Sequence, residues 1–158
     1  YRIQIMTFVD EYTAPRYIVS DDRRKQIVLK EKGEPRRYVA NNSKGKRVVV
    51  FKVDDGIITD KTQPRCDYAL WTEENSVYFV ELKGGDYSKA LIQVHQTIQQ
   101  LVERPNINTK LVNARIVLSN GRAVKAAVAN TYEVKLRQLL KKYGGCLTKA
   151  TQQFEEWV

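Results

Sequence analysis

Two apolar runs decide the fold: Arg65-Cys66-Asp67-Tyr68-Ala69-Leu70 and Val77-Tyr78-Phe79-Val80-Glu81-Leu82-Lys83-Gly84-Gly85. The polar segment at residues 72–75 separates them, so they are predicted to form an antiparallel strand pair. Alternate residues of a strand point to one face, so Glu81 and Lys83 emerge together while Leu82 faces the other way. If the two strands pair, Asp67 comes close to both charged groups.

Two carboxylates and an ammonium group at one strand end suit Mg²⁺-dependent hydrolysis of a phosphodiester. Mg²⁺ prefers carboxylate oxygens and keeps several water molecules. Asp67 and Glu81, together with the carbonyl of Leu82, would therefore form an incomplete shell that leaves room for substrate. Mn²⁺ would substitute for Mg²⁺. Lys83 would orient or deprotonate the attacking water and stabilise the phosphate in the transition state.

The spacing resembles a known family. Asp67, thirteen intervening residues and Glu81-Leu82-Lys83 on a strand pair followed by a helix resemble the PD-(D/E)xK nuclease superfamily. The resemblance covers roughly residues 46–119. It implies a restriction-endonuclease-like fold and Mg²⁺-dependent cleavage of nucleic acid, usually DNA, with Asp67, Glu81 and Lys83 at the catalytic positions. Cys66 stands where the nominal family motif has a proline.

The same resemblance implies accessory side chains. Many members add a glutamate from a helix near the N-terminus, and Glu31 and Glu34 are the only candidates in a suitable region. Some members place a glutamine on the helix after the lysine. Gln93 and Gln96, with Gln100, fall on one face of the predicted helix, opposite its apolar stripe. Spacing leaves open whether that face meets the active site or solvent.

Composition indicates one domain with a polyanionic partner. A chain of 158 residues with 42% hydrophobic residues suffices for a single core, and a net charge of +9 favours nucleic acid. Residues 21–52 carry 11 basic and 4 acidic side chains, residues 53–109 carry 5 and 9, and residues 110–150 carry 9 and 1. The acidic centre thus lies between basic flanks. The candidate phosphate contacts on these flanks are Arg23, Arg24, Lys25, Arg36, Arg37, Lys44, Lys46, Arg47, Arg122 and Lys125.

Cysteine content and hydropathy indicate the compartment. Cys66 and Cys146 lie far apart, with no second pair to build a disulfide framework, which favours a reducing environment. No apolar run approaches the roughly 18 residues that a membrane span requires, and the start lacks a signal-peptide pattern. A cytoplasmic protein without a membrane partner is expected.

The remaining chain predicts one α/β domain over residues 1–158, with a core at roughly 46–143. A single mixed central sheet is expected, flanked by helices and extended by an N-terminal hairpin. Residues 21–34 fit either a helix capped by Ser20 or Asp21 or a strand at 26–30, and we favour the helix. The other expected elements are a hairpin of residues 36–41 and 46–53, a helix from Asp86 or Ser88 to before Pro105, a strand at 114–119, a helix at 131–143, and an undecided tail at 146–158.

Two hypotheses follow for function. The first is a metal-dependent endonuclease acting on DNA more than on RNA, for which a symmetric dimer with two sites would give paired cuts. The second is a module that retains this fold but only binds nucleic acid or assembles with partners. Intact Asp67, Glu81 and Lys83 favour the first, whereas the lack of a clear N-terminal acid favours the second.

Overall fold

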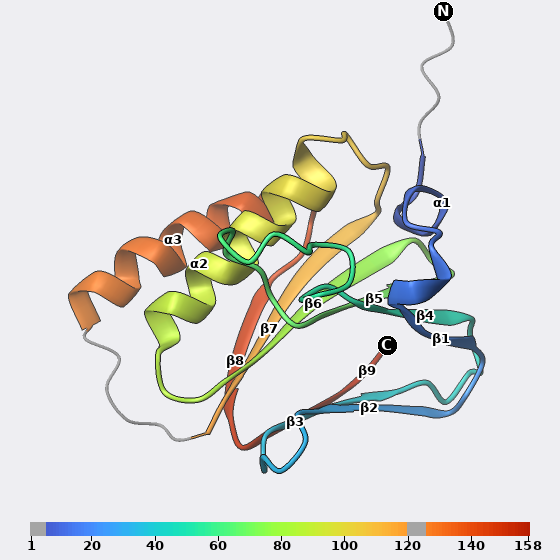
Figure 1. Cartoon of the computed structure of the whole chain (residues 1–158), viewed down its shortest axis with the longest axis horizontal. Coiled ribbons are helices and arrows are strands. Elements are labelled where there is room, and N and C mark those ends of the chain that lie inside the picture. The colour runs from blue at the N-terminus through green and yellow to red at the C-terminus, as the bar shows by residue number, and fades with distance from the viewer. Residues whose placement is uncertain (1–5, 120–125) are drawn as a thin grey trace, which may run out of the picture.

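A six-stranded mixed sheet forms the centre of the molecule (Figure 1). A computed structural model describes residues 6–119 and 126–158, with side chains described outside 126–130. The strand order is β1-β4-β5-β6-β7-β8; β1, β4, β5 and β6 are antiparallel neighbours, while β6, β7 and β8 are parallel. This confirms the predicted α/β fold with a mixed central sheet. The strands are β1 (Ile18–Asp22), β4 (Val48–Lys52), β5 (Tyr68–Thr72), β6 (Ser76–Lys83), β7 (Leu111–Leu118) and β8 (Leu147–Thr151).

A second, three-stranded sheet lies below one face of the first in Figure 1. It contains β2 (Gln26–Lys30), β3 (Arg37–Asn41) and β9 (Gln153–Trp157), in the order β2-β3-β9. β2 and β3 are antiparallel, and β3 and β9 are parallel. The tail that the sequence left undecided therefore forms two strands, and each belongs to a different sheet.

Two expectations for the N-terminal part were wrong. The helix expected over 21–34 is instead the end of β1 followed by β2, in which buried Ile27 and Leu29 alternate with exposed neighbours at the strand period. The segments 36–41 and 46–53 do form strands, but they do not pair as a hairpin. β3 pairs with β2 and β9, while β4 pairs with β1 and β5. The turn between them therefore carries the chain from one sheet to the other.

Helices cover the other face of the central sheet (Figure 1). α2 (Tyr87–Ile98) continues as a π-helical segment, Gln99–Glu103, and α3 (Ala126–Lys142) packs beside it. The N-terminal end of α2 is capped by Asp86, whose side chain accepts a hydrogen bond from the Lys89 N–H, as predicted. The predicted strand 114–119 and helix 131–143 are also confirmed, although both begin earlier. Two short elements, α1 (Phe8–Glu11) and a 3₁₀ turn (Pro15–Tyr17), precede β1.

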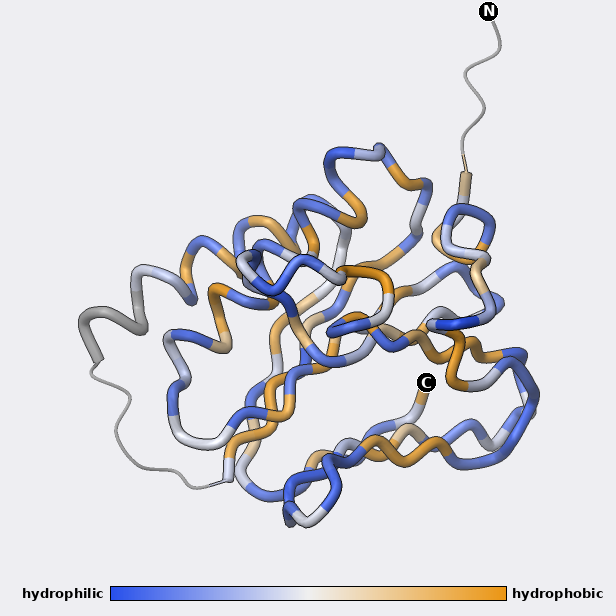
Figure 2. The backbone as a smooth tube through the Cα atoms, viewed as in Figure 1, coloured by the Kyte–Doolittle hydropathy of each residue, from blue (hydrophilic) through white to orange (hydrophobic). Residues whose placement is uncertain are grey.

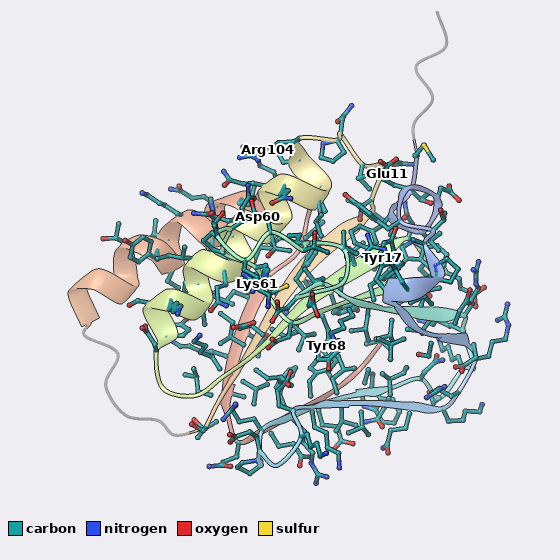
Figure 3. The ribbon with its side chains drawn as sticks, in the orientation of Figure 1. Glu11, Tyr17, Asp60, Lys61, Tyr68 and Arg104 are labelled. Carbon is teal, nitrogen blue, oxygen red and sulfur yellow. The ribbon has the colours of Figure 1, made fainter. Side chains whose placement is uncertain are left out.

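β6 is apolar because both of its faces are covered. Val77 and Phe79 face the helices, whereas Val80 and Leu82 face the small sheet. Figure 2 shows hydrophobic residues along the central strands and hydrophilic ones along the connections. Tyr68 lies between the two sheets (Figure 3). The alternation places Glu81, which follows Phe79 by two residues, on the helix-covered face.

No helix in the described part of the chain is both long enough and apolar enough to cross a bilayer.

Candidate active site

The candidate site lies where β6 extends past the start of β5. Tyr68, the first residue of β5, pairs with Val80. The last three residues of β6, Glu81 to Lys83, therefore have no β5 residue beside them. Asp67 takes that place through its side chain, whose Oδ2 accepts a hydrogen bond from the Leu82 N–H at 2.8 Å. The N–H and C=O of one strand residue point to the same side. The Leu82 carbonyl therefore faces the edge that Asp67 occupies.

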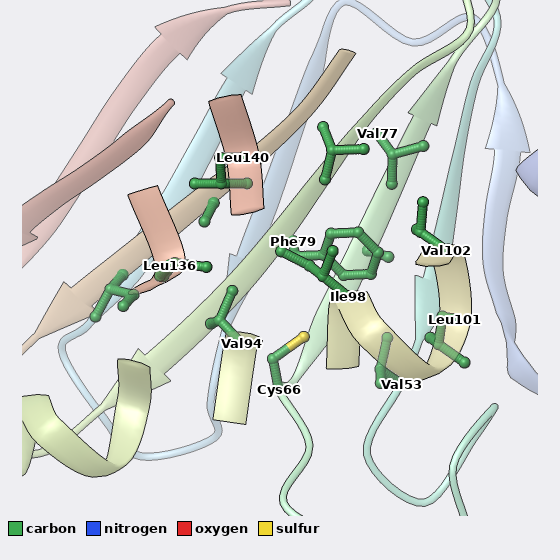
Figure 4. Packing of buried hydrophobic residues seen from close by; sticks show 14 of the residues in the cluster. Val53, Cys66, Val77, Phe79, Val94, Ile98, Leu101, Val102, Leu136 and Leu140 are labelled. Atoms are coloured by element: carbon green, nitrogen blue, oxygen red, sulfur yellow. The ribbon is translucent and has the colours of Figure 1, made fainter. Parts of the chain in front are cut away.

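Asp67 is held in position by α2. The buried side chain of Cys66 lies in the helix-covered core near Val94 and Phe79 (Figure 4). The Cys66 N–H donates to Thr97 Oγ1 at 2.9 Å, and the Thr97 hydroxyl donates to the Gln93 carbonyl at 2.7 Å. A proline at position 66 has no N–H and would leave the buried Thr97 hydroxyl without this donor. Cys66 thus supplies a backbone donor to α2 that a proline could not supply.

Glu81 is a buried carboxyl group beside Asp67. Its side chain is 2% exposed, and its Oε1 has no hydrogen-bond partner in the described structure. The two carboxyl groups lie close enough for each to shift the pKa of the other. Burial, and then the charge of Asp67, raise the pKa of Glu81 well above its ordinary value. Burial also raises the pKa of Asp67, against the lowering effect of the Leu82 N–H. Asp67 and Glu81 are therefore a largely buried pair of acids and not part of an exposed surface ion pair.

Lys83 completes the predicted set. It lies two residues beyond Glu81, and its charge lowers the pKa of both Asp67 and Glu81, so its ammonium group lies within electrostatic reach of both. Within the described residues no carboxylate lies within ion-pairing distance of Lys83. The ammonium group thus acts on both acids electrostatically without forming an ion pair with either.

The two candidate accessory glutamates have different surroundings. Both lie in the connection after β2, and neither is helical. Glu31 is half-buried, and its pKa is raised by burial and then by the charge of Asp67. Glu34 is exposed and forms an ion pair with Arg36 at 3.1 Å. The fold thus brings Glu31, from the small sheet, toward Asp67, and it leaves Glu34 in an ion pair at the surface.

The two candidate glutamines of α2 also have different surroundings. Gln93 donates from Nε2 to the Arg65 carbonyl at 2.9 Å, and its Oε1 is buried without a partner among the described groups. Gln96 is exposed and lines a different hollow, between α2 and α3, with His95. Only Gln93 contacts the segment that leads into Asp67.

Asp54 is an acid whose closeness to the site the sequence did not indicate. It pairs with Arg65 at 2.6 Å, and its charge raises the pKa of both Asp67 and Glu31. Its position in an Asp-Asp-Gly turn gave only a turn signal. Asp54 lies beside Asp67 because the pairing of β4 with β5 continues past the strand ends: the N–H groups of Val53 and Asp54 donate to the Asp67 carbonyl, at 2.9 and 3.4 Å.

The donor set fits a hard cation held by few protein ligands. No group of three His, Cys, Asp or Glu side chains in the described part of the chain is arranged to hold a metal ion. Mg²⁺, however, is commonly bound by one or two carboxylates and keeps several water molecules. Asp67, Glu81 and the Leu82 carbonyl meet that requirement, and the partnerless Glu81 Oε1 is the atom that a cation would satisfy.

Many of the predicted phosphate contacts lie elsewhere. Five are in ion pairs: Arg23 with Glu73 at 3.0 Å, Arg24 with Asp22 at 2.6 Å, Arg36 with Glu34 at 3.1 Å, Lys46 with Glu74 at 2.9 Å and Arg47 with Asp21 at 2.8 Å. Those that pair with residues 73 and 74 lie at the turn before β6, past Ser76, which is itself about 17 Å from Glu81 along the strand at about 3.3 Å per residue.

Lys25, Arg37 and Lys44 form no ion pair among the described residues. Lys25 donates to the Ser43 carbonyl at 2.8 Å, Arg37 donates to Gln153 at 2.6 Å, and Lys44 is exposed. Arg122 and Lys125 lie outside the described residues. Among the described predicted contacts, only Arg36 lies near the candidate site, since its charge lowers the pKa of Glu31.

The pKa shift of Glu81 predicts how the stability of the metal-free protein depends on pH. In the unfolded chain this group loses its proton near its ordinary pKa of 4.5, whereas the folded chain keeps it to higher pH. The folded state then binds more protons, so stability falls as pH rises above about 4.5. Glu81→Gln stays neutral, and its melting temperature in EDTA at about pH 8 should exceed that of the wild type by a few degrees. Equal melting temperatures at that pH would contradict the assignment.

Asp67, Glu81 and Lys83 thus meet at one strand end, with Glu31, Asp54 and Gln93 around them. Two acids, a lysine and a strand carbonyl are the groups that this corner offers to a ligand. No family model matches the chain, and neither a curated protein nor a solved structure matches it.

Proposed function

We propose that the chain is a metal-dependent endonuclease that hydrolyses phosphodiester bonds in DNA. The observation that carries the proposal is the buried Glu81 carboxyl group, which has one oxygen without a partner and lies against Asp67. A buried acid pair is costly unless it is matched by a cation or serves a reaction. A lysine with no ion pair beside the acids adds the positive group that a phosphate would contact.

Asp67, Glu81 and the Leu82 carbonyl would hold Mg²⁺, or Mn²⁺ in its place. A bound cation of this kind neutralises charge on the phosphate and lowers the pKa of a coordinated water. The ligands must be ionised to bind it, so the proton that Glu81 holds would leave on binding. The Leu82 N–H keeps Asp67 Oδ2 in place and leaves Asp67 Oδ1 free of that bond.

Lys83 would act on the phosphate and on the attacking water. Its ammonium group shares a face of β6 with Glu81, so it can donate a hydrogen bond to a phosphate oxygen placed over the acids. The same group can hold the water in line with the phosphorus. Burial of Glu81 and half-burial of Asp67 reduce the competition of bulk water for these contacts.

Glu31 is proposed as the accessory acid, with Glu34 as its natural control. Glu31→Ala should raise the Mg²⁺ concentration for half-maximal cleavage roughly tenfold or more, because a charge near Asp67 is lost. Glu34→Ala removes the same charge from an exposed ion pair and should change it less than about twofold. Mg²⁺ titrations of initial cleavage rates measure both. Equal effects of the two substitutions would exclude Glu31 as the accessory acid.

The experiment that tests the proposal is incubation of the purified protein with supercoiled plasmid, linear duplex, branched DNA and RNA. Each is treated with Mg²⁺, with Mn²⁺ and with EDTA. Cleavage in either metal and none in EDTA is expected, with DNA cut faster than RNA. Paired cuts on both strands would indicate two active sites acting together, as in a symmetric dimer.

A second candidate function is a non-catalytic module that binds nucleic acid or assembles with partners. The observation that favours it is that no three metal-ligating side chains come together in the described part of the chain. The same incubation separates the two candidates. Binding of DNA in EDTA without cleavage of any substrate in either metal would support the module and rule out the nuclease.

A further inference from the structure

A polar pocket adjoins the candidate active site. It has a volume of about 380 Å³ and is formed by the loop at residues 61–65 and the N-terminal half of α2. Figure 3 labels Lys61 on this loop, where it crosses in front of α2. Its lining includes the charged or amide side chains of Asp54, Lys61, Gln63, Arg65, Lys89 and Gln93. The volume lies in the range of small-ligand sites.

The pocket shares residues with the surroundings of Asp67. Asp54 and Gln93 line it, and both belong to the set around the acids. Arg65 precedes Asp67 by two residues, which is at most about 7 Å of extended chain. A strand bound with its phosphate over Asp67 and Glu81 would therefore carry a neighbouring phosphate within reach of this pocket.

The pocket carries unbalanced positive charge. Asp54 and Arg65 neutralise each other at 2.6 Å. Lys61 and Lys89 are exposed, and neither forms an ion pair with any described residue. Five of the sequence-predicted contacts differ in this respect, because they are already paired with acids. Two unpaired ammonium groups at one hollow are suited to a phosphate, which a compact cation binds as a point charge.

We propose that this pocket binds a backbone phosphate of the nucleotide next to the cleaved bond, held by Lys61 and Lys89. The inference rests on the proposed nuclease function for its position relative to the cleaved bond. The phosphate belongs either to an unpaired strand that enters the pocket or to a duplex that lies across its mouth. Gln63 lines the same pocket and offers an amide N–H to the same ligand.

The test measures the affinity of oligonucleotides by fluorescence anisotropy in EDTA, so that no cleavage occurs. Wild type is compared with the double variant Lys61→Ala/Lys89→Ala. The matched control is Lys110→Ala/Lys141→Ala, which removes the same charge from two exposed lysines that line none of this pocket and form no described ion pair. The pocket variant should bind roughly three- to tenfold more weakly. Its affinity should also fall less steeply with salt, with the magnitude of the slope of log affinity against log salt smaller by roughly one to two.

Phosphate contact is located by methylphosphonate linkages placed one at a time along the oligonucleotide. At one position the neutral linkage should weaken wild-type binding roughly threefold or more and leave the pocket variant unaffected. The scan is run on single strands and on duplexes, and coupling in one form alone identifies the source of the phosphate. Equal losses in the pocket variant and the control, or no coupled position in either form, would overturn the proposal. Coupling without any cleavage in Mg²⁺ would refute the nuclease and leave the phosphate pocket standing.

Discussion

Lys83→Ala is expected to reduce the rate of metal-dependent cleavage by about 10²- to 10⁴-fold while leaving DNA affinity in EDTA nearly unchanged. The ammonium group lies within electrostatic reach of Asp67 and Glu81 without pairing with either, so its loss would remove the positive charge that the proposal assigns to stabilising the phosphate. Binding elsewhere on a chain with a net charge of +9 changes little. Single-turnover cleavage and anisotropy on the same preparations separate the two effects.

Two controls sharpen that result. Lys110→Ala removes an exposed lysine outside the site and should cleave at the wild-type rate. Lys83→Arg keeps the charge but not the compact geometry of an ammonium group, so it should recover only part of the rate. A Lys83→Ala protein that is folded and cleaves within about threefold of the wild type would remove Lys83 from the mechanism.

Arg115→Ala is expected to lower the free energy of unfolding by about 3–5 kcal/mol. Arg115, on β7, is 6% exposed and forms an ion pair with Glu156 of β9 at 2.8 Å. Tyr38 of β3 also donates to Glu156, at 2.7 Å. The guanidinium lies over the rings of Tyr78 and Phe154. Its removal leaves a largely buried carboxylate without its cation at the junction of the two sheets.

Urea denaturation followed by fluorescence measures this loss. Arg23→Ala is the matched control. The Arg23 side chain is 62% exposed in its ion pair with Glu73, so its removal should leave the urea midpoint almost unchanged. Since Glu31 lies in the connection between β2 and β3 of the small sheet and acts on Asp67, Arg115→Ala should also weaken metal-dependent activity. Equal midpoints for Arg115→Ala and the wild type would mean that the pair does not join the sheets energetically.

Local patterns in the sequence were enough to predict the central elements. Alternation along Val77 to Lys83 indicated both the strand and the shared face of Glu81 and Lys83, and two glycines followed by Asp86 indicated the break and the next helix. These features depend on near neighbours. The strand pair of β5 and β6 needed only a short turn, so it too could be predicted.

Partners distant in the sequence could not be predicted in this way. β3 is bracketed by β2 and by β9, and the Tyr38–Phe154 register joins residues more than a hundred positions apart. Nothing in residues 36–53 distinguishes a hairpin from two strands in different sheets. Residues 26–30 fit a helix as well as a strand, because Ser20 or Asp21 can cap a helix there and Gly33 can end it.

The candidate site was predictable in its centre and not at its margins. Asp67, Glu81 and Lys83 are spaced by strand geometry, which the sequence carries. Glu31 approaches them because one sheet packs on the other, and Asp54 does so because β4 pairs with β5. A count of basic residues does not show which lysines and arginines have acids beside them. Ion pairing separates Arg23 and Arg47 from Lys61 and Lys89.

The most direct test of the account compares the cleavage rates of the wild type and Asp67→Asn on one plasmid preparation in Mg²⁺. Asparagine keeps an oxygen that can accept the Leu82 N–H bond, so circular dichroism and melting should show a folded protein. The account predicts metal-dependent cleavage by the wild type and a loss of at least about a hundredfold in the variant. A folded Asp67→Asn protein that cleaves at the wild-type rate, or a wild type that cleaves no substrate in either metal, would contradict it.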